Sequence, residues 1–456
     1  MRKATDIAAA CAIAAAVVVY FLPPPAGASA GTMHAAGLVL LTIALWGLGV
    51  MAEHVTALLF FLLAMVLAIA PAELVFSGFT SATMWLVLGG LFIAHAVTVT
   101  GLGGRFAALL FDRYADSYRA LLAAVAVAAT LLPFLMPATV ARMLLLLPIV
   151  MAAAKRAGFA QGSSGYYGLV MTAIFFTYNS GTGVLPANAP NMVLVGAAEA
   201  VHHRHIIYAE YLWVMFPVIA LVKGLIAVPL IWSLYPAQIA NRAAAEARQP
   251  MTAAQRRLAI IIAMALVLWT TDFAHGIRPG WIALGAAVVC LLPRVGVLPQ
   301  SAFSEVKLGP FFYTAATIGL GAVAVESGLG ALLGRVADAT IDLQPGRDFG
   351  NFIALTLLAT AVSVMTTNPA EPALLTPIAD HFAAVAGWPL NAALMTIAIG
   401  FTTVLLPYQV PPIVVGMHYA GVGMRAALRV MLPLAAVGFL LLPVDYLWWR
   451  LIGYFG

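Results

Sequence analysis

The sequence predicts an all-α polytopic membrane protein built from two inverted-topology repeats, and three observations support this fold class. Hydrophobic residues make up 63% of the 456 residues and charged residues 9%, against roughly 25% charged in soluble domains. Many apolar runs are long enough to cross a bilayer, which gives about 11 spans joined by short loops. Two proline-containing segments with a polar interruption stand at matching positions of the two halves, a pattern typical of secondary transporters.

The apolar runs divide into simple spans and irregular elements. Simple spans are expected at 7–22, 34–51, 54–70, 83–100, 210–233, 258–272, 280–293, 309–327 and 428–449. Between them lie two pairs of irregular elements, 119–155 with 165–200 and 350–386 with 391–423. The first member of each pair has a polar break, which predicts a re-entrant hairpin of two half-helices. The second is expected to be a broken helix, because irregular backbone at membrane depth must line a cavity or be buried.

This order of elements predicts four parts. Residues 1–33 form an N-terminal transmembrane helix and loop, which resembles a signal peptide but is interpreted as a first span. Residues 34–235 form the first transporter repeat, and residues 236–257 a solvated cytoplasmic connector. Residues 258–456 form the second repeat with a C-terminal helix.

Charge placement predicts the orientation of the chain. With the N-terminus in the cytoplasm, roughly three basic residues fall inside for every one outside, as the positive-inside rule expects. Lys155 and Arg248 then face the cytoplasm, Arg204 and Arg347 face outside, and the two hairpins open to opposite sides. The net charge of +5 is thus explained by topology and not by nucleic-acid binding. A bacterial inner membrane is the expected location.

The two hairpins each carry one charged residue at membrane depth. The first contains Met136 to Pro148 and the second Thr366 to Pro377; aligned on the final prolines, they place Arg142 opposite Glu371. An intramembrane Arg is a functional hypothesis by default, and its planar fork suits a carboxylate or sulfate. A structural ion pair with Glu371 is the alternative, and both interpretations stay open. Glu371 could also carry a coupling proton.

The two broken helices concentrate small polar side chains. In the first they are Asn179, Ser180, Thr182, Asn188 and Asn191, and around the second they are Thr367, Asn368 and Gln409. Unwound carbonyls and polar side chains can coordinate a cation, while half-helix N-termini favour an anion. The alternative is that these groups satisfy the broken backbone.

Several motifs resemble one family of carriers. The run from Trp46 to Glu53, the tripeptide Thr367-Asn368-Pro369 with its central Asn, and Asn188-Ala-Pro-Asn191 are similar to segments of the divalent anion/sodium symporter family, which includes dicarboxylate, citrate and sulfate carriers within the ion-transporter superfamily. The chain departs from the family pattern at two places. The first tip, Ala138-Thr139-Val140, has no Asn, and Ile413 stands where Asn is usual.

The resemblance implies roles for these residues. Arg142 and Glu371 are candidates because of their charge at membrane depth, the first for the substrate and the second for proton coupling. The resemblance itself implies that the tips and breaks bind the substrate, here at Thr139, Asn188, Asn191, Thr367, Asn368 and Gln409, and a possible Na⁺, here at Asn179, Ser180, Thr182 and Asn368. It also implies a homodimer. Because of the departures, Na⁺ and H⁺ remain alternative coupling ions.

The sequence therefore predicts a secondary active symporter of small anions, such as di- or tricarboxylates or sulfate, working by alternating access. Its expected partners are the anion, the coupling cation and the lipid bilayer, without nucleic acid or a cofactor other than a possible Na⁺. The alternative is a cation/proton antiporter of the same fold. An intramembrane enzyme is disfavoured, because neither His-Glu-x-x-His nor Gly-x-Ser-x-Gly occurs.

Overall fold

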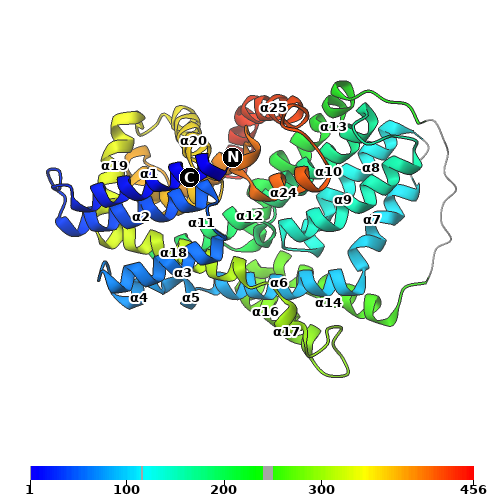
Figure 1. Ribbon diagram of the computed structural model, residues 1–456, viewed down its shortest axis with the longest axis horizontal. Helices are drawn as coiled ribbons and strands as arrows, with labels where there is room; N and C mark the ends of the chain where they lie inside the picture. Colours follow the sequence, from blue (N-terminus) through cyan, green and yellow to red (C-terminus); the bar gives the residue numbers. More distant parts are fainter. Residues whose placement is uncertain (1, 114–116, 240–249, 456) are drawn as a thin grey trace.

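The computed structural model describes residues 2–113, 117–239 and 250–455, and these residues form helices and connecting loops with no strand (Figure 1). The first half contains α1 (Arg2–Phe21), α2 (Ala30–Leu48), α3 (Glu53–Val66), α4 (Ala72–Val75), α5 (Ser77–Thr80), α6 (Ala82–Thr100), α7 (Leu102–Arg113), α8 (Tyr118–Leu135), α9 (Thr139–Arg156), α10 (Ser164–Thr182), η1 (Leu185–Ala187), α11 (Ala189–His202), α12 (Tyr208–Met215), the π-helical η2 (Phe216–Val222) and α13 (Lys223–Leu234).

The second half of the described chain is also helical. It contains α14 (Ala253–Thr270), α15 (Asp272–His275), α16 (Pro279–Leu291), α17 (Ala302–Glu305), α18 (Gly309–Glu326), α19 (Leu329–Thr340), α20 (Asp348–Met365), α21 (Ala370–Leu375), η3 (Thr376–Ile378), α22 (Ala379–Ala386), α23 (Leu390–Thr402), η4 (Pro407–Gln409), α24 (Pro411–Tyr419) and α25 (Met424–Leu451). The hairpin α8–α9 and the broken helix α10–α11 have counterparts in α20–α21 and α23–α24.

Seven helices of the described chain are long and apolar enough to cross a membrane: α2, α6, α8, α12 with α13, α14, α20 and α25. The pair α18 and α19, bent by 82°, brings this number to eight if it forms one span. Shorter apolar helices occur at Ile7–Phe21, Glu53–Val66, Pro279–Leu291 and Leu390–Thr402. The prediction of an all-α polytopic membrane protein is confirmed. The number of about 11 spans and the inversion of the repeats stay predictions.

Some helices that start in loops are capped by side chains, whereas the helices that start at the tips and breaks are not. Ser117 accepts a hydrogen bond from the backbone of Ala120 at the start of α8, and Ser163 accepts one from Tyr166 at the start of α10. No side chain caps the N-terminus of α9, α11, α21 or α24. All four N-termini keep the positive end of the helix dipole. Free backbone N–H groups remain at α9 and α11, whereas those of α21 and α24 are replaced by prolines or bond the carbonyls of Thr367 and Val410.

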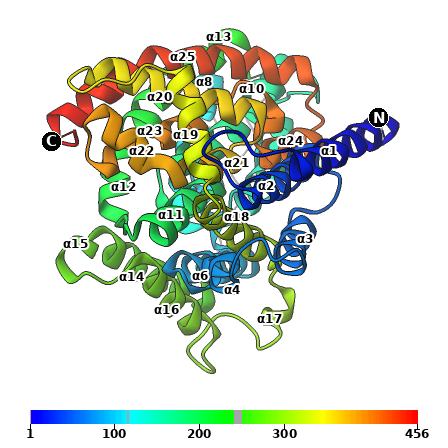
Figure 2. The same ribbon diagram turned by 90° about the vertical axis from the view of Figure 1, so that its left-hand side faces the viewer.

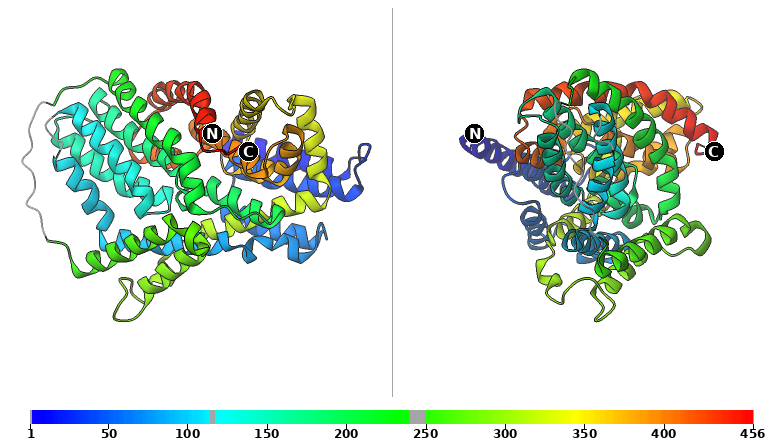
Figure 3. Two further views of the ribbon diagram at one scale, coloured as in Figure 1. Left: turned by 180° about the vertical axis from the view of Figure 1, so that it is seen from behind. Right: turned by 90° about the vertical axis from the view of Figure 1, so that its right-hand side faces the viewer.

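Helices from both halves pack together near the centre of the molecule. The helices α8, α9 and α10 lie toward one end of its long axis and α19 and α20 toward the other, in both Figure 1 and the left view of Figure 3. The helices α11 and α18 pack together near the centre, which Figure 2 shows from the side. Close approach uses small residues: a Cβ on Gly89 of α6 would lie 2.5 Å from the backbone of Ala283 on α16, as is typical of membrane helix pairs.

Two amphipathic helices were not among the predicted spans. These are α7 and α19, which follow α6 and α18 at corresponding places in the two halves. Their charged residues, such as Arg105 and Arg335, removed the continuous apolar run that signals a span. Hydropathy therefore located the spans but not these adjoining helices.

Loops predicted on one side of the membrane contact one another. Arg450 bonds Asp348 at 3.2 Å, and Arg204 bonds Asn391 at 2.6 Å, joining loops predicted outside. Arg257 bonds the backbone carbonyl of Arg294 at 3.0 Å, joining loops predicted inside. These contacts agree with the charge-based layout, whose orientation and four-part division stay predictions. Residues 240–249 of the predicted connector, including Arg248, lie outside the described residues.

Candidate functional site

The first hairpin tip is held by Arg142. Met136 leaves the helical conformation and α9 begins at Thr139, so the tip exposes backbone carbonyls inside the membrane. The fully buried Arg142 donates to the carbonyl of Met136 at 2.6 Å and to that of Thr177 on α10 at 3.1 Å. It also donates to the Thr139 hydroxyl at 3.2 Å. The guanidinium therefore fixes the tip against α10.

Thr139 links this tip to the first broken helix. Its hydroxyl lies 3.0 Å from the carbonyl oxygen of Ala187 and 3.2 Å from the side-chain oxygen of Asn188. The Nδ2 atom of Asn188 is buried and has no hydrogen-bond partner within the described chain. A buried donor without a partner is costly, so this atom is a candidate contact for a bound acceptor.

The first break is held open by two asparagines. Asn191 donates to the carbonyls of Gly181 and Val184, each at 3.0 Å, and thereby spans the gap in the helix. Asn179 donates to the carbonyl of Ile219 in η2 at 2.8 Å. The side-chain oxygens of both asparagines are buried without a partner among the described residues. Ser180 and Thr182 donate to backbone carbonyls of their own helix.

The second tip and the second break form one closed hydrogen-bond network. The oxygen of Asn368 accepts from Ser363 and, at 3.3 Å, from Gln409. Gln409 accepts from the backbone N–H groups of Leu405 and Leu406, both at 2.8 Å. The buried Thr367 contributes its carbonyl, which accepts from the N–H of Glu371 at 3.1 Å. Asn368 and Gln409 therefore meet, and the backbone N–H of Asn368 also donates to the carbonyl of Gln409 at 2.8 Å.

Tyr178 joins the two halves and was missed by sequence reasoning, as was Ser363. The hydroxyl of Tyr178 donates to the carbonyl of Phe401 at 2.8 Å and accepts from Asn368. A tyrosine directly before the polar cluster that begins at Asn179 was the available signal. Ser363 precedes the tip by one helical turn, where an ordinary helix serine looks the same.

The structure does not pair Arg142 with Glu371. Glu371 is fully buried, and neither of its carboxyl oxygens has a hydrogen-bond partner in the described part of the chain. The donors of Arg142 are directed at carbonyls and at Thr139 instead. The structural ion pair considered for these two residues is therefore not formed.

A cavity of about 330 Å³ lies where the tips and breaks converge. Its lining comes from both tips, both breaks, α3, α6 and α18, and includes Glu53, Pro137, Thr139, Pro186, Asn188, Tyr313, Thr314, Pro369, Pro411 and Pro412. Of the predicted site residues, Thr139 and Asn188 line the cavity directly. Arg142, Asn191, Asn368 and Gln409 are not part of its lining. Sequence reasoning missed the contribution of α18, which reads as an ordinary span.

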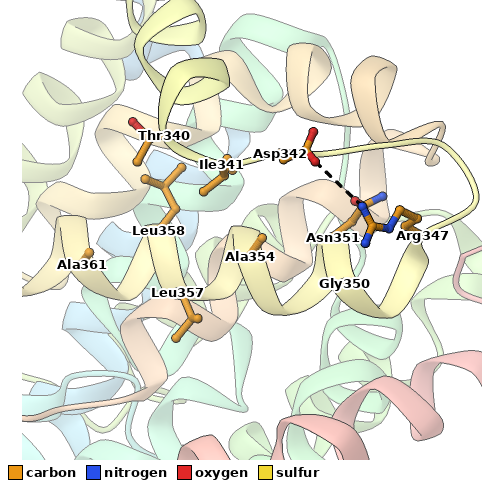
Figure 4. Close-up of a pocket in the computed structure, with 10 residues that line it drawn as sticks. All are labelled: Thr340, Ile341, Asp342, Arg347, Gly350, Asn351, Ala354, Leu357, Leu358 and Ala361. Atoms are coloured by element: carbon orange, nitrogen blue, oxygen red, sulfur yellow. Dashed lines mark ion pairs between the residues drawn. The ribbon is translucent and has the colours of Figure 1, made fainter.

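A second hollow lies apart from these residues. It measures about 600 Å³ and is lined by α20 and by the segment that follows α19, with the Asp342–Arg347 ion pair at 3.8 Å on its rim (Figure 4). It contains no predicted site residue. The described residues also hold no group of three or more His, Cys, Asp and Glu side chains that could bind a metal ion.

Comparisons with known proteins agree with this architecture. The family described as the sodium:sulfate symporter transmembrane region matches residues 3–455. A protein of Cupriavidus necator known as a membrane protein is 24% identical over 393 residues, covering 83% of this chain and 76% of that protein. The crystal structure of the Alcanivorax borkumensis YdaH transporter, described as having an unusual topology, superposes with a TM-score of 0.59 at 16% identity, covering 94% of this chain and 99% of that one.

Proposed function

Because the chain belongs to the sodium:sulfate symporter family, we propose that it carries a small dianion, such as sulfate or a dicarboxylate, together with a coupling cation. The family is one of secondary transporters, and this excludes the intramembrane enzyme. The substrate and the coupling ion are the proposed part. A homodimer, as the family resemblance implies, belongs to the same proposal.

Uncapped helix N-termini around one cavity support an anionic substrate. The helices α9, α11 and α24 begin beside the cavity at Thr139, Ala189 and Pro411, and each lacks a side-chain cap. Each N-terminus carries roughly half a positive charge. The helices α9 and α11 also present free N–H groups, whereas α24 begins with Pro411 and Pro412 and its next two N–H groups bond the Val410 carbonyl. None of the described lining residues is Lys or Arg. Backbone N–H groups, Thr139 and the free Nδ2 of Asn188 therefore bind the anion.

Two sites are proposed for the coupling cation. The free side-chain oxygens of Asn179 and Asn191 lie at the first break, and hard cations such as Na⁺ prefer oxygen ligands. Glu371 at the second tip is the site for a proton, because a buried carboxyl group without a partner is stable only when neutral or when a cation joins it. Binding either cation lowers the cost of bringing an anion into the membrane.

A second candidate function, cation/proton antiport, is favoured by one observation. Glu53 is the charged side chain in the described cavity lining, and a carboxylate there would attract a cation. The two functions differ in whether an anion moves with the cation.

Uptake into proteoliposomes tests the proposal. Labelled sulfate and labelled succinate are offered separately under an inward Na⁺ gradient, an inward H⁺ gradient, or choline with no gradient. Symport predicts accumulation of at least one anion that requires a cation gradient. Cation-dependent proton flux without anion uptake would establish the antiporter instead. Glu371→Gln should abolish the H⁺-driven component and leave the Na⁺-driven one.

A matched pair of variants connects uptake to the cavity. Thr139→Val removes a hydroxyl from the lining, whereas Thr172→Val removes an equally buried hydroxyl that bonds within α10 at 2.7 Å. Thr139→Val should raise the KM for the anion about tenfold, the effect of losing roughly 1.4 kcal/mol, and Thr172→Val should leave it unchanged. Equal KM values for both variants would contradict the assignment of the cavity.

A further inference from the structure

The C-terminal end of α23 lies inside the membrane at the second break, and side chains bond all of its last four carbonyls. Those of Ile399 and Gly400 accept from Thr402 and Thr360, and that of Phe401 accepts from Tyr178 and Asn368. The carbonyl of Thr402, the last residue of the helix, accepts from the ammonium group of Lys223 at 3.2 Å. One end of a half-helix therefore receives a full positive charge.

At the equivalent end in the first half, the guanidinium group of Arg142 lies beside Gly181, but within the described chain it bonds none of the last four carbonyls of α10. There α10 ends at Thr182, and the carbonyl of Thr182 accepts from the hydroxyl of Tyr211 at 2.9 Å. Asn191 and the hydroxyl of Thr182 bond the carbonyls before it. Both helix ends are satisfied, but the first by neutral donors alone. The difference lies in Lys223.

The junction of η2 with α13 and the contact with α25 fix the position of Lys223. It begins α13 directly after the seven-residue π-helical η2, and π-helical segments inside helices are frequent at functional sites. The residue is 3% exposed, so its ammonium group does not reach an interface. It crosses α25 at Gly438, where a Cβ would lie 3.4 Å from the Lys223 Nζ atom. A larger residue at Gly438 would press against this ammonium group.

A second buried ionisable residue near Lys223 is Asp445. It lies two turns after Gly438 on α25 and is 3% exposed, and its Oδ1 atom has no hydrogen-bond partner within the described chain. Asp445 is close enough to interact with Lys223 electrostatically but forms no direct ion pair with it in the described chain. The Phe175 ring lies 5.7 Å from the ammonium group. The end of α23 thus combines backbone carbonyls, the negative end of a helix dipole and a nearby carboxylate. Carbonyl oxygens are ligands for a monovalent cation, and the helix dipole and the carboxylate supply the negative potential that attracts it.

We propose that the ammonium group of Lys223 is a built-in cation that occupies the second-break cation position, so that sodium binds at the first break and not at the second. The inference rests on the proposed function, which assigns the coupling Na⁺ to the first break. It adds that the two halves of the carrier use different cations, one exchangeable and one covalently attached. The number of coupling ions per transport cycle is thereby reduced by one.

Equilibrium binding of ²²Na⁺ to the purified full-length protein tests this directly. Lys223→Ala removes the ammonium group and leaves space beside the Thr402 carbonyl, so this variant should bind about one more Na⁺ per chain than the wild type. Lys223→Met, which is neutral but fills the space, and Lys223→Arg, which keeps a cation, should not gain this ion. Asp445→Asn combined with Lys223→Ala should lose it again.

Equal Na⁺ stoichiometry in the wild type and in Lys223→Ala would overturn the proposal. Lys223→Ser, which keeps a hydroxyl beside the carbonyl, supplies the same measurement if Lys223→Ala does not remain monodisperse. An extra ion that persists after Asp445→Asn would also overturn it, because that ion would bind elsewhere. The readout requires no transported anion, so failure of sulfate and succinate uptake would refute the proposed function and leave this stoichiometry intact.

Discussion

The two helix breaks occupy corresponding places in the halves, but different side-chain arrangements satisfy their backbone hydrogen-bonding groups. At the first, Asn179 and Asn191 each donate to backbone carbonyls and leave an oxygen free inside the protein. At the second, Asn368 and Gln409 use their side-chain groups within a closed network. A break must satisfy its backbone wherever it lies in the membrane. The amide oxygens of Asn179 and Asn191 are unused within the described chain, whereas those of Asn368 and Gln409 both accept hydrogen bonds. This difference marks the first break as the place for an exchangeable cation.

The tips that face these breaks differ as well. A single charged residue, Arg142, ties the first tip to α10, whereas neutral groups around Ser363 and Asn368 tie the second tip to its broken helix. Positive charge is therefore placed at the first tip and at the second break. Four substitutions test this division between the halves.

The largest effect is expected for Arg142→Met. This change leaves the carbonyls of Met136 and Thr177 buried without their donor, at roughly 1–3 kcal/mol each, so the protein should lose about 3 kcal/mol of stability. Thermal unfolding in detergent measures this. Arg119→Met on the neighbouring α8 is the control, since Arg119 is exposed and stacks on Trp232; it should cost less than about 1 kcal/mol. If the Arg142→Met protein is stable but no longer binds anions, Arg142 is a substrate-binding residue and not a structural one.

Asn368→Leu should have the next largest effect. It breaks the contacts to Ser363, Tyr178 and the carbonyl of Phe401, and a loss of about 2 kcal/mol is expected from the buried groups left behind. The same unfolding measurement applies. Na⁺ binding should be unchanged, because the second break is proposed to hold no sodium. A loss of one bound Na⁺ would place an ion at the second tip and contradict the proposal that sodium binds only in the first half.

Asn191→Leu tests the first break. Removing the free oxygen should raise the Na⁺ concentration for half-maximal uptake about tenfold, or roughly 1.4 kcal/mol in binding. Asn351→Leu serves as a comparison, because Asn351 is equally buried but bonds the Gln344 backbone far from the breaks. It should affect stability and not the Na⁺ response. An unchanged Na⁺ response in Asn191→Leu would remove this residue from the cation site.

The smallest effect is expected for Tyr211→Phe. The loss of one neutral hydrogen bond to the Thr182 carbonyl should cost about 1 kcal/mol, measured by thermal unfolding. Na⁺ stoichiometry should not change, in contrast to the gain expected when Lys223 is shortened at the other break. If Tyr211→Phe also bound an extra sodium, the two helix ends would be alike and the comparison would fail.

Local chemistry made the spans and breaks predictable. Apolar runs of bilayer length identified nearly every membrane helix, and the Pro, Gly and Asn clusters identified both hairpins and both broken helices, because these residues interrupt helical hydrogen bonding within a few positions. The convergence of the tips and breaks was expected from their paired occurrence. The cavity that Thr139 and Asn188 line agrees with that expectation.

Partners far apart in the chain were beyond the reach of local patterns. Lys223 and Thr402 are 179 residues apart, and Tyr178 and Asn368 are 190 apart. The sequence required each buried polar group to be compensated, because an uncompensated one is costly in the membrane. The partner of each group could not be predicted from the sequence. Arg142, for example, donates to backbone carbonyls and does not pair with Glu371. That choice depends on which helix ends meet after folding, and packing of the whole chain sets it.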